Sequence, residues 1–123
     1  MSLSNDLYEI NHSISLKEAV KMTSRYRAEV QLMLQPEYAG ALPISQTFQK
    51  SIFAELAAAA GCVAIRSYYG MDENNNVCLI FVGVDENNND ILAGVNQEAA
   101  SIFEYGQRCP PICGPASPLN PQG

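Results

Sequence analysis

The sequence predicts an α+β fold in which two helices pack on a small antiparallel β-meander, followed by an irregular, proline-rich C-terminal tail. Apolar residues recur every three or four positions between residues 16 and 33 and again between 48 and 59, as in amphipathic helices. From Cys62 the period changes to two, as in a β-strand. Two identical Asp-Glu-Asn-Asn-Asn segments then separate apolar runs, which is typical of hairpin turns.

The first helix is predicted to begin after Ser15. Ser15 and Glu18 form a capping-box pattern, in which the serine hydroxyl accepts a hydrogen bond from the Glu18 amide and the Glu18 carboxylate reaches back. The helix should end near Leu34 because Pro36 follows. One apolar stripe runs along it, made by Leu16, Ala19, Val20, Thr23, Tyr26, Val30 and Met33.

A second helix is expected to begin near residues 45–47, after a loop from Pro36 to Pro43. Gly61 is placed to end this helix in a left-handed turn. Its inward face would consist of Phe48, Ile52, Leu56 and Ala59, widened by Phe53 and Ala57.

The meander is predicted from the segments that follow. Residues 62–69 alternate along one strand, and residues 77–84 are almost wholly apolar, which fits a central strand covered on both faces. A third, shorter strand is expected at 90–93, and a further helix at 96–105. The resulting organisation is a single α+β domain of residues 1–105 and a flexible Cys/Pro-rich tail of residues 106–123, because prolines exclude helix and central strand there.

Composition restricts the classes of partner. The chain has 123 residues and a net charge of −6, so a nucleic acid or an anionic membrane is not expected to bind it. The N-terminal residues lack the basic and apolar regions of a secretory signal, and no apolar run approaches the ~20 residues that span a bilayer. We therefore expect a cytoplasmic protein.

Four segments carry a resemblance to known sequences. They are Ile14–Val20, Gly61–Asp72 (with Gly-Cys-x-x-Ile-Arg-x-Tyr-Tyr-Gly), Phe81–Asp85 and Gly106–Pro111, which opens Gly-Gln-Arg-Cys-Pro-Pro-x-Cys. In these segments the chain resembles a group of small hypothetical proteins from Bacteroidota-type bacteria. The resemblance covers most of the chain and implies a bacterial protein, but it carries no activity and no site residue across to this sequence.

The cysteines leave a thiol function open. Cys109 and Cys113 have CxxxC spacing in the tail, and His12 is the only histidine, so these residues make an incomplete zinc set. Cys62 and Cys78 would lie ~23 Å apart in the predicted hairpin and cannot complete it. Cys109 and Cys113 could instead form a disulfide or a redox pair, aided by the neighbouring Arg108, or be incidental thiols on a flexible tail.

The two Asp-Glu-Asn-Asn-Asn segments also resemble the start of a calcium-binding EF-hand loop. The required glycine at the sixth position is Val77 in one segment and Asp90 in the other, and the flanking segments are predicted strands. Hairpin turns explain both segments, because Asn and Asp tolerate left-handed backbone.

Charged residues offer two further hypotheses. Lys17, Lys21 and Arg25 form a basic stripe on the first helix, either a solvated face or a docking face for an acidic partner. Arg66 lies mid-strand on the same side as Tyr68. If the helices cover that side, Arg66 needs a carboxylate or could hold a small anion with Tyr68; the apolar Val63 and Ile65 favour the opposite arrangement, with Arg66 exposed.

No nucleophile elbow, P-loop, dinucleotide fingerprint or HExxH motif is present in the sequence. We therefore expect a non-enzymatic interaction or accessory module without a cofactor, whose exposed Cys-Pro-Pro tail contacts a protein partner. A homodimer through a sheet edge is compatible with this fold. The alternatives are a metal-handling or redox module using Cys109 and Cys113, and a small-anion binder using Arg66.

Overall fold

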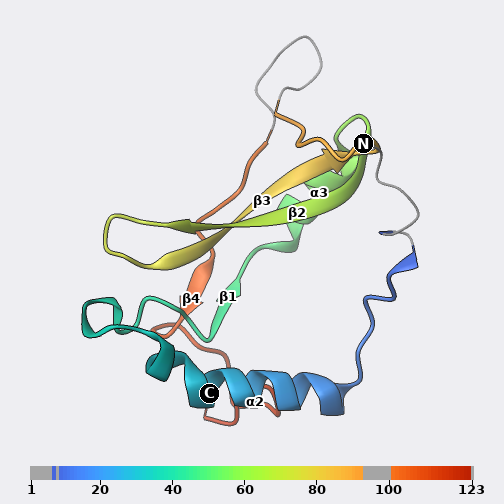
Figure 1. The fold of residues 1–123 in the computed structure, drawn as a ribbon. Coiled ribbons are helices and arrows are strands. Elements are labelled where there is room, and N and C mark those ends of the chain that lie inside the picture. Colours follow the sequence, from blue (N-terminus) through green and yellow to red (C-terminus); the bar gives the residue numbers. More distant parts are fainter. Residues whose placement is uncertain (1–6, 8, 93–100, 123) are drawn as a thin grey trace. The chain divides into compact units, whose positions relative to one another are not determined.

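The computed structural model describes residues 7, 9–92 and 101–122. Its elements are helices α2 (Leu16–Met33) and α3 (Lys50–Ala58), the 3-10 turn η1 (Pro36–Tyr38), and strands β1 (Ser45–Thr47), β2 (Cys62–Met71), β3 (Val77–Asp85) and β4 (Gln107–Cys109) (Figure 1). The strands make two antiparallel pairs, β2 with β3 and β1 with β4. The predicted α+β class, with two helices and small antiparallel sheets, is confirmed.

The chain divides into two compact units, each assembled from three separate segments. The first unit combines residues 1–11, 47–70 and 78–106. The second combines residues 12–46, 71–77 and 107–123, so α2 and the C-terminal segment belong to the same unit. This division cuts the chain differently from the expected domain of residues 1–105 and separate tail.

Helix α2 forms as its sequence predicts. The Ser15 hydroxyl accepts from the backbone N–H of Glu18 at 3.0 Å and so caps the helix N-terminus. On the predicted apolar stripe, Val30 is buried, and Ala19, Val20, Thr23 and Tyr26 are half-buried. The two residues at the ends of the stripe, Leu16 and Met33, are exposed, so only the middle of the helix is covered.

The second helix is shorter than predicted. Residues 45–47, expected to open it, form β1, and α3 starts only at Lys50. The reason is non-local, because β1 pairs with β4, which lies some sixty positions further along the chain. The end of the helix is closer to expectation, since Gly61 has the left-handed φ of 78°.

The hairpin of β2 and β3 is turned by the first Asp-Glu-Asn-Asn-Asn segment, as predicted. The Asp72 Oδ1 accepts from the backbone N–H groups of Asn74 and Asn76 at 2.8 and 2.9 Å, and Asn75 takes φ 64°. The second segment repeats this geometry, with Asp85 in the accepting role and Asn88 at φ 67°. Both segments are therefore turns built on an aspartate side chain.

Strand β3 has a partner along each edge. In addition to its pairing with β2, β3 forms two isolated antiparallel bridges. Val84 pairs with Asp90, and Phe81 pairs with Phe103. In place of the expected third strand at 90–93, the structure has the Asp90 bridge and one further hydrogen bond, which the Ile91 N–H donates to the Gly83 carbonyl at 2.9 Å. Residue 93 lies outside the described residues. Of the predicted helix at 96–105, residues 96–100 lie outside them too, and residues 101–105 are not helical.

The interior of the first unit centres on three phenylalanines and on buried aliphatic side chains. The Phe48 and Phe53 rings meet the Phe81 ring edge-on, with centroids 4.9 and 5.1 Å away. Leu56 in α3 and Val82 and Val84 in β3 are each 2% exposed. Residues 82–84 are buried in succession, which confirms that β3 is covered on both faces there.

Candidate functional site

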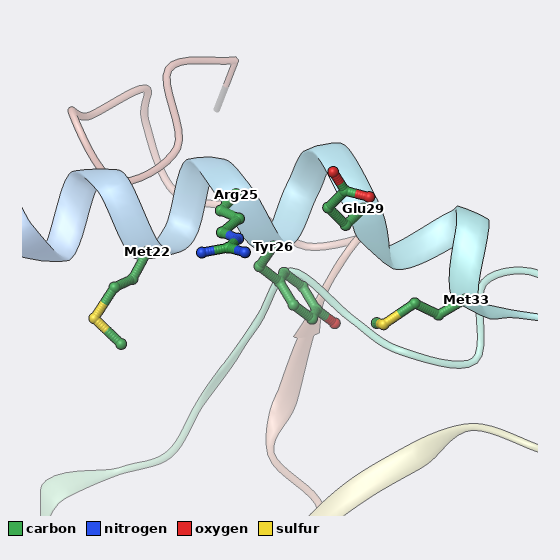
Figure 2. A pocket seen from close by; sticks show the side chains of 5 residues that line it. All are labelled: Met22, Arg25, Tyr26, Glu29 and Met33. Carbon is green, nitrogen blue, oxygen red and sulfur yellow. The ribbon is translucent and has the colours of Figure 1, made fainter.

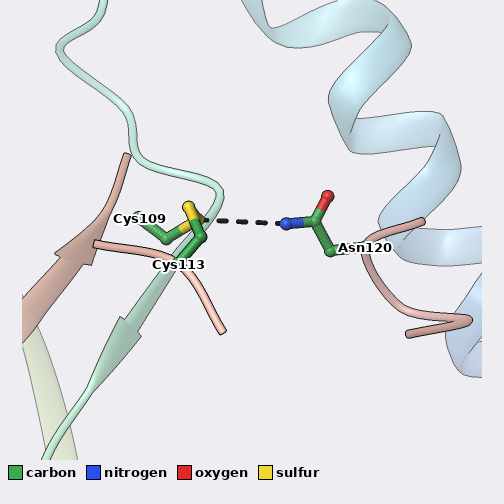
Figure 3. The surroundings of a disulfide bond; sticks show 3 residues. All are labelled: Cys109, Cys113 and Asn120. Carbon is green, nitrogen blue, oxygen red and sulfur yellow. Dashed lines mark hydrogen bonds between the residues drawn. A yellow bond between two sulfur atoms is a disulfide. The ribbon is translucent and has the colours of Figure 1, made fainter. Parts of the chain in front are cut away.

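The C-terminal segment forms a five-residue loop, Cys109 to Cys113, closed by a disulfide and here named the CPPIC loop (Figure 3). The Cα atoms of the two cysteines are 4.8 Å apart, and the Ile112 N–H donates to the Arg108 carbonyl at 3.0 Å. Pro110 and Pro111, each after a cis peptide bond, are exposed. Ile112 is 56% exposed, whereas Cys109 is 2% exposed, so the loop presents apolar side chains and buries one sulfur.

The loop is attached to the second unit through β4. The Ile44 N–H donates to the Cys109 carbonyl at 2.7 Å. The Arg108 guanidinium donates to the carbonyls of Val77 and, at 3.0 Å, of Ala41. The prediction of an unattached, exposed tail is therefore wrong for residues 107–109, because Arg108 and the β4 backbone find partners that lie far away in sequence.

A turn at residues 117–120 contacts the disulfide through one side chain. Ser117 and Asn120 exchange backbone hydrogen bonds of 3.1 and 3.0 Å, and the Asn120 side-chain amide donates to the Cys109 Sγ at 3.9 Å (Figure 3). The carbonyl of Leu119 accepts from Arg27 of α2 at 2.5 Å. The segment after the CPPIC loop is thus tied both to a helix and to the buried sulfur.

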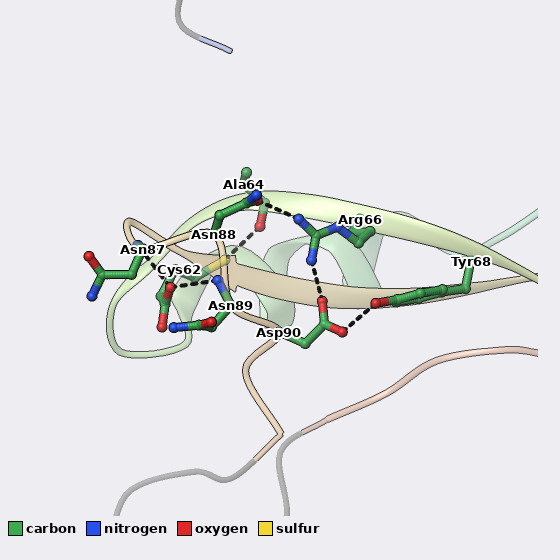
Figure 4. Close-up of polar contacts among 9 residues, drawn as sticks. Cys62, Ala64, Arg66, Tyr68, Asn87, Asn88, Asn89 and Asp90 are labelled. Carbon is green, nitrogen blue, oxygen red and sulfur yellow. Dashed lines mark hydrogen bonds and ion pairs between the residues drawn. The ribbon is translucent and has the colours of Figure 1, made fainter. Parts of the chain in front are cut away.

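Arg66, the other candidate predicted from the sequence, lies in a polar cluster of the first unit (Figure 4). Its guanidinium donates to the Asp90 Oδ1 at 2.6 Å and to the Asn88 Oδ1 at 2.5 Å. The Tyr68 hydroxyl donates to the other Asp90 oxygen at 2.5 Å. Arg66 and Tyr68, paired in the anion-binding hypothesis, are therefore brought together, but around a carboxylate of the chain itself.

The side of β2 that carries Arg66 is the more covered one. Cys62, Ala64 and Arg66 are half-buried, whereas Val63 and Ile65 are 44% and 39% exposed. The Arg66 side chain is 32% exposed and has a carboxylate partner, so it lies between the favoured exposed arrangement and the buried alternative. The sequence signal for Asp90 as that partner was weak, because it lies beyond the second turn, 24 positions away.

The cluster shifts the titration of its members. The Tyr68 hydrogen bond, followed by the bond and charge of Arg66, holds the pKa of Asp90 below its usual value. The same contact with Asp90 raises the pKa of Tyr68, and Asp90 keeps the pKa of Arg66 above its ordinary value. Asp90 thereby supplies the negative charge that a bound anion would otherwise bring, so a free anion would have to compete with it.

The surface of α2 carries a shallow hollow of about 680 Å³ (Figure 2). Its lining residues all belong to this helix: Met22, Arg25, Tyr26, Glu29 and Met33. The Tyr26 hydroxyl donates to the Pro43 carbonyl at 2.7 Å, and burial raises the pKa of this tyrosine. The predicted basic stripe of Lys17, Lys21 and Arg25 is exposed, as a solvated face and a docking face both require.

The remaining candidates do not form a metal centre in the described residues. Cys62 and Cys78 lie outside the disulfide, the first half-buried and the second buried, and His12 is exposed. Within residues 7, 9–92 and 101–122, no three His, Cys, Asp or Glu side chains lie close enough to hold a metal ion. In the same ranges none of the helices is both long and apolar enough to cross a bilayer.

Comparison with models of protein families, with curated proteins and with solved structures finds no match for this chain. The CPPIC loop and the Arg66 cluster are therefore the two candidate functional features of the described residues. Sequence reasoning located Cys109, Cys113, Arg66 and Tyr68. It missed Asn120, which no motif marks.

Proposed function

We propose that this protein is a small, non-enzymatic interaction module of a bacterial cell, and that the CPPIC loop is its contact element. The observation that carries the proposal is the exposure of Pro110, Pro111 and Ile112 at the tip of a loop closed by a disulfide. A loop restricted in this way loses less conformational entropy on binding than an open chain does. The apolar tip favours a protein partner with an apolar pocket.

The test compares two isoleucines of similar exposure. Ile112 is 56% exposed and Ile14 is 59% exposed, and Ile14 precedes the capping residue of α2. Protein with Ile112→Asn should lose the partner that immobilised wild-type protein captures, whereas Ile14→Asn should retain it. Equal capture by both variants would exclude the loop. Truncation of the C-terminal segment is unsuitable, because it removes β4.

A second copy of the chain is the other partner that we propose to test. In the described residues β2 pairs with β3 alone, and the face that carries Val63, Ile65 and Tyr69 is exposed. An edge strand with an exposed apolar face favours strand pairing between molecules. Light scattering over a range of protein concentrations should reveal a dimer that Ile65→Lys weakens; a monomer at every concentration contradicts the dimer.

The disulfide itself favours a second candidate function, which is thiol–disulfide exchange. Disulfides of reducing compartments are usually transient, so a cytoplasmic protein with this bond would cycle between its oxidised and reduced forms. Alkylation of cell extracts under acid quench should then find both forms of the Cys109–Cys113 pair. Only the oxidised form under all growth conditions would remove this candidate.

A further inference from the structure

We infer that the Cys109–Cys113 disulfide is a polarised exchange site, in which an external thiol attacks Cys113 and Cys109 is the leaving sulfur. The substrate class is a dithiol reductant, such as a protein with a pair of redox-active cysteines. This inference rests on the second candidate function, thiol exchange, and assigns a separate role to each sulfur.

Access separates the two sulfurs. Cys109 is 2% exposed and its backbone is fixed in β4 by the Ile44 N–H bond of 2.7 Å. Cys113 is half-buried and lies between exposed Ile112 and exposed Gly114. Thiol–disulfide exchange needs the attacking thiolate in line with the sulfur–sulfur bond, so the approach to Cys113 is the open one.

Hydrogen bonding favours the same direction. The Asn120 side-chain amide donates to the Cys109 Sγ at 3.9 Å, a contact that becomes charge-assisted when this sulfur leaves as a thiolate (Figure 3). A donor on the leaving thiolate lowers its pKa, and a leaving thiol of lower pKa departs faster. The side-chain amide of Asn120 is thus a positioning group for the leaving sulfur.

The exchange balances as two displacements. The reductant's thiolate forms a bond to the Cys113 Sγ while the bond between the two sulfurs breaks, and the electron pair goes to the Cys109 Sγ. The second thiolate of the reductant then attacks its own sulfur in the mixed disulfide and releases the Cys113 thiolate. The reductant becomes a disulfide, and its two protons are taken up by the cysteine thiolates of this protein.

The direct test maps the mixed disulfide. Oxidised full-length protein is treated with a limiting amount of the monothiol glutathione, quenched with acid within seconds and digested at low pH for mass spectrometry. We expect glutathione on Cys113. Its presence on Cys109, or equally on both cysteines, overturns the assignment of roles and leaves thiol exchange standing. A disulfide that stays closed while a reference protein disulfide is reduced overturns both.

Two further readouts do not depend on catching the intermediate. In fully reduced protein, Cys113 should react with a maleimide at least tenfold faster than Cys109, because Cys109 remains in β4; equal rates contradict the proposal. Asn120→Ala should slow reduction of the disulfide about threefold. This figure assumes that the substitution raises the pKa of the leaving Cys109 thiol by ~1 unit. It also assumes that the exchange rate depends on the leaving-thiol pKa about as strongly as on the attacking-thiol pKa, with a Brønsted coefficient of ~0.4–0.5. The exposed Gln122→Ala is the matched control and should leave the rate unchanged; an unchanged rate in Asn120→Ala as well removes the role of Asn120.

Discussion

Replacing Gly106 by alanine tests the packing of the first unit directly. A Cβ at this position would lie 2.4 Å from both Cε1 and Cζ of the Phe48 ring. Phe48 in turn meets Phe81 edge-on at 4.9 Å, so the ring has little freedom to withdraw. Gly106 is needed here for its missing side chain, since its φ lies outside the left-handed region.

The size of the effect follows from this distance. Carbon atoms in contact lie ~3.5–4.0 Å apart, so the ring or the backbone has to move by more than ~1 Å. Overpacking of this kind costs about 1–3 kcal/mol, and we expect the upper half of that range because ring and backbone are both held. At Gly114 an added Cβ meets nothing within 4 Å, so Gly114→Ala should change stability by less than about 0.5 kcal/mol.

Urea unfolding followed by far-ultraviolet circular dichroism measures both variants, since the chain has no tryptophan. The cause is isolated by repeating Gly106→Ala in a Phe48→Val background, where the clash is absent and the cost should fall below about 0.5 kcal/mol. An equal cost in both backgrounds, or equal midpoints for the two alanine variants, would refute the reasoning.

Three further predictions concern caps, core and titration. Ser15→Ala should lower the free energy of unfolding by about 1 kcal/mol, because it removes the N-cap of α2, and Ser15→Asp should restore it; no difference between the two variants would contradict the cap. Leu56→Ala, which empties a site 2% exposed, should cost about 2–5 kcal/mol in the same urea assay, and a loss below 1 kcal/mol would show that α3 is not packed as described. Tyr68 and Arg66 lower the pKa of Asp90 in the folded protein. The ionised Asp90 carboxylate therefore stabilises the fold above the pKa of ~3.9 that aspartate has in the unfolded chain. This stabilisation is lost as the pH falls through the lower pKa of the folded state. Urea midpoints of Asp90→Asn should therefore fall less steeply than those of wild type below pH ~4, and parallel curves would rule this out.

Local chemistry made much of the fold predictable. The capping box at Ser15, the period-two alternation after Cys62 and the aspartate-based turns at Asp72 and Asp85 each depend on residues within a few positions of one another. Such features appear in the structure where the sequence indicated them. The left-handed φ of Gly61 belongs to the same group.

The features that could not be predicted from the sequence depend on contacts between residues far apart along the chain. The sequence at residues 45–47 predicts the start of a helix, but these residues form a strand because they pair with β4. The prolines after Cys109 correctly excluded regular structure, but they say nothing of the backbone partners that bury Cys109. The charge partner of Arg66 is likewise not marked by its neighbours in sequence, because Asp90 lies beyond the second turn, 24 positions away.

The discontinuous make-up of the second unit bears on its synthesis. Helix α2 leaves the ribosome early. Arg27 cannot bond to the Leu119 carbonyl until that residue, 92 positions later, has been synthesised, and β1 cannot pair before β4 has been synthesised. At ~5–20 residues per second, the nascent helix spends several seconds without these contacts. The nascent second unit therefore lacks both the Arg27 bond and the β1–β4 pairing until its C-terminal segment has been translated.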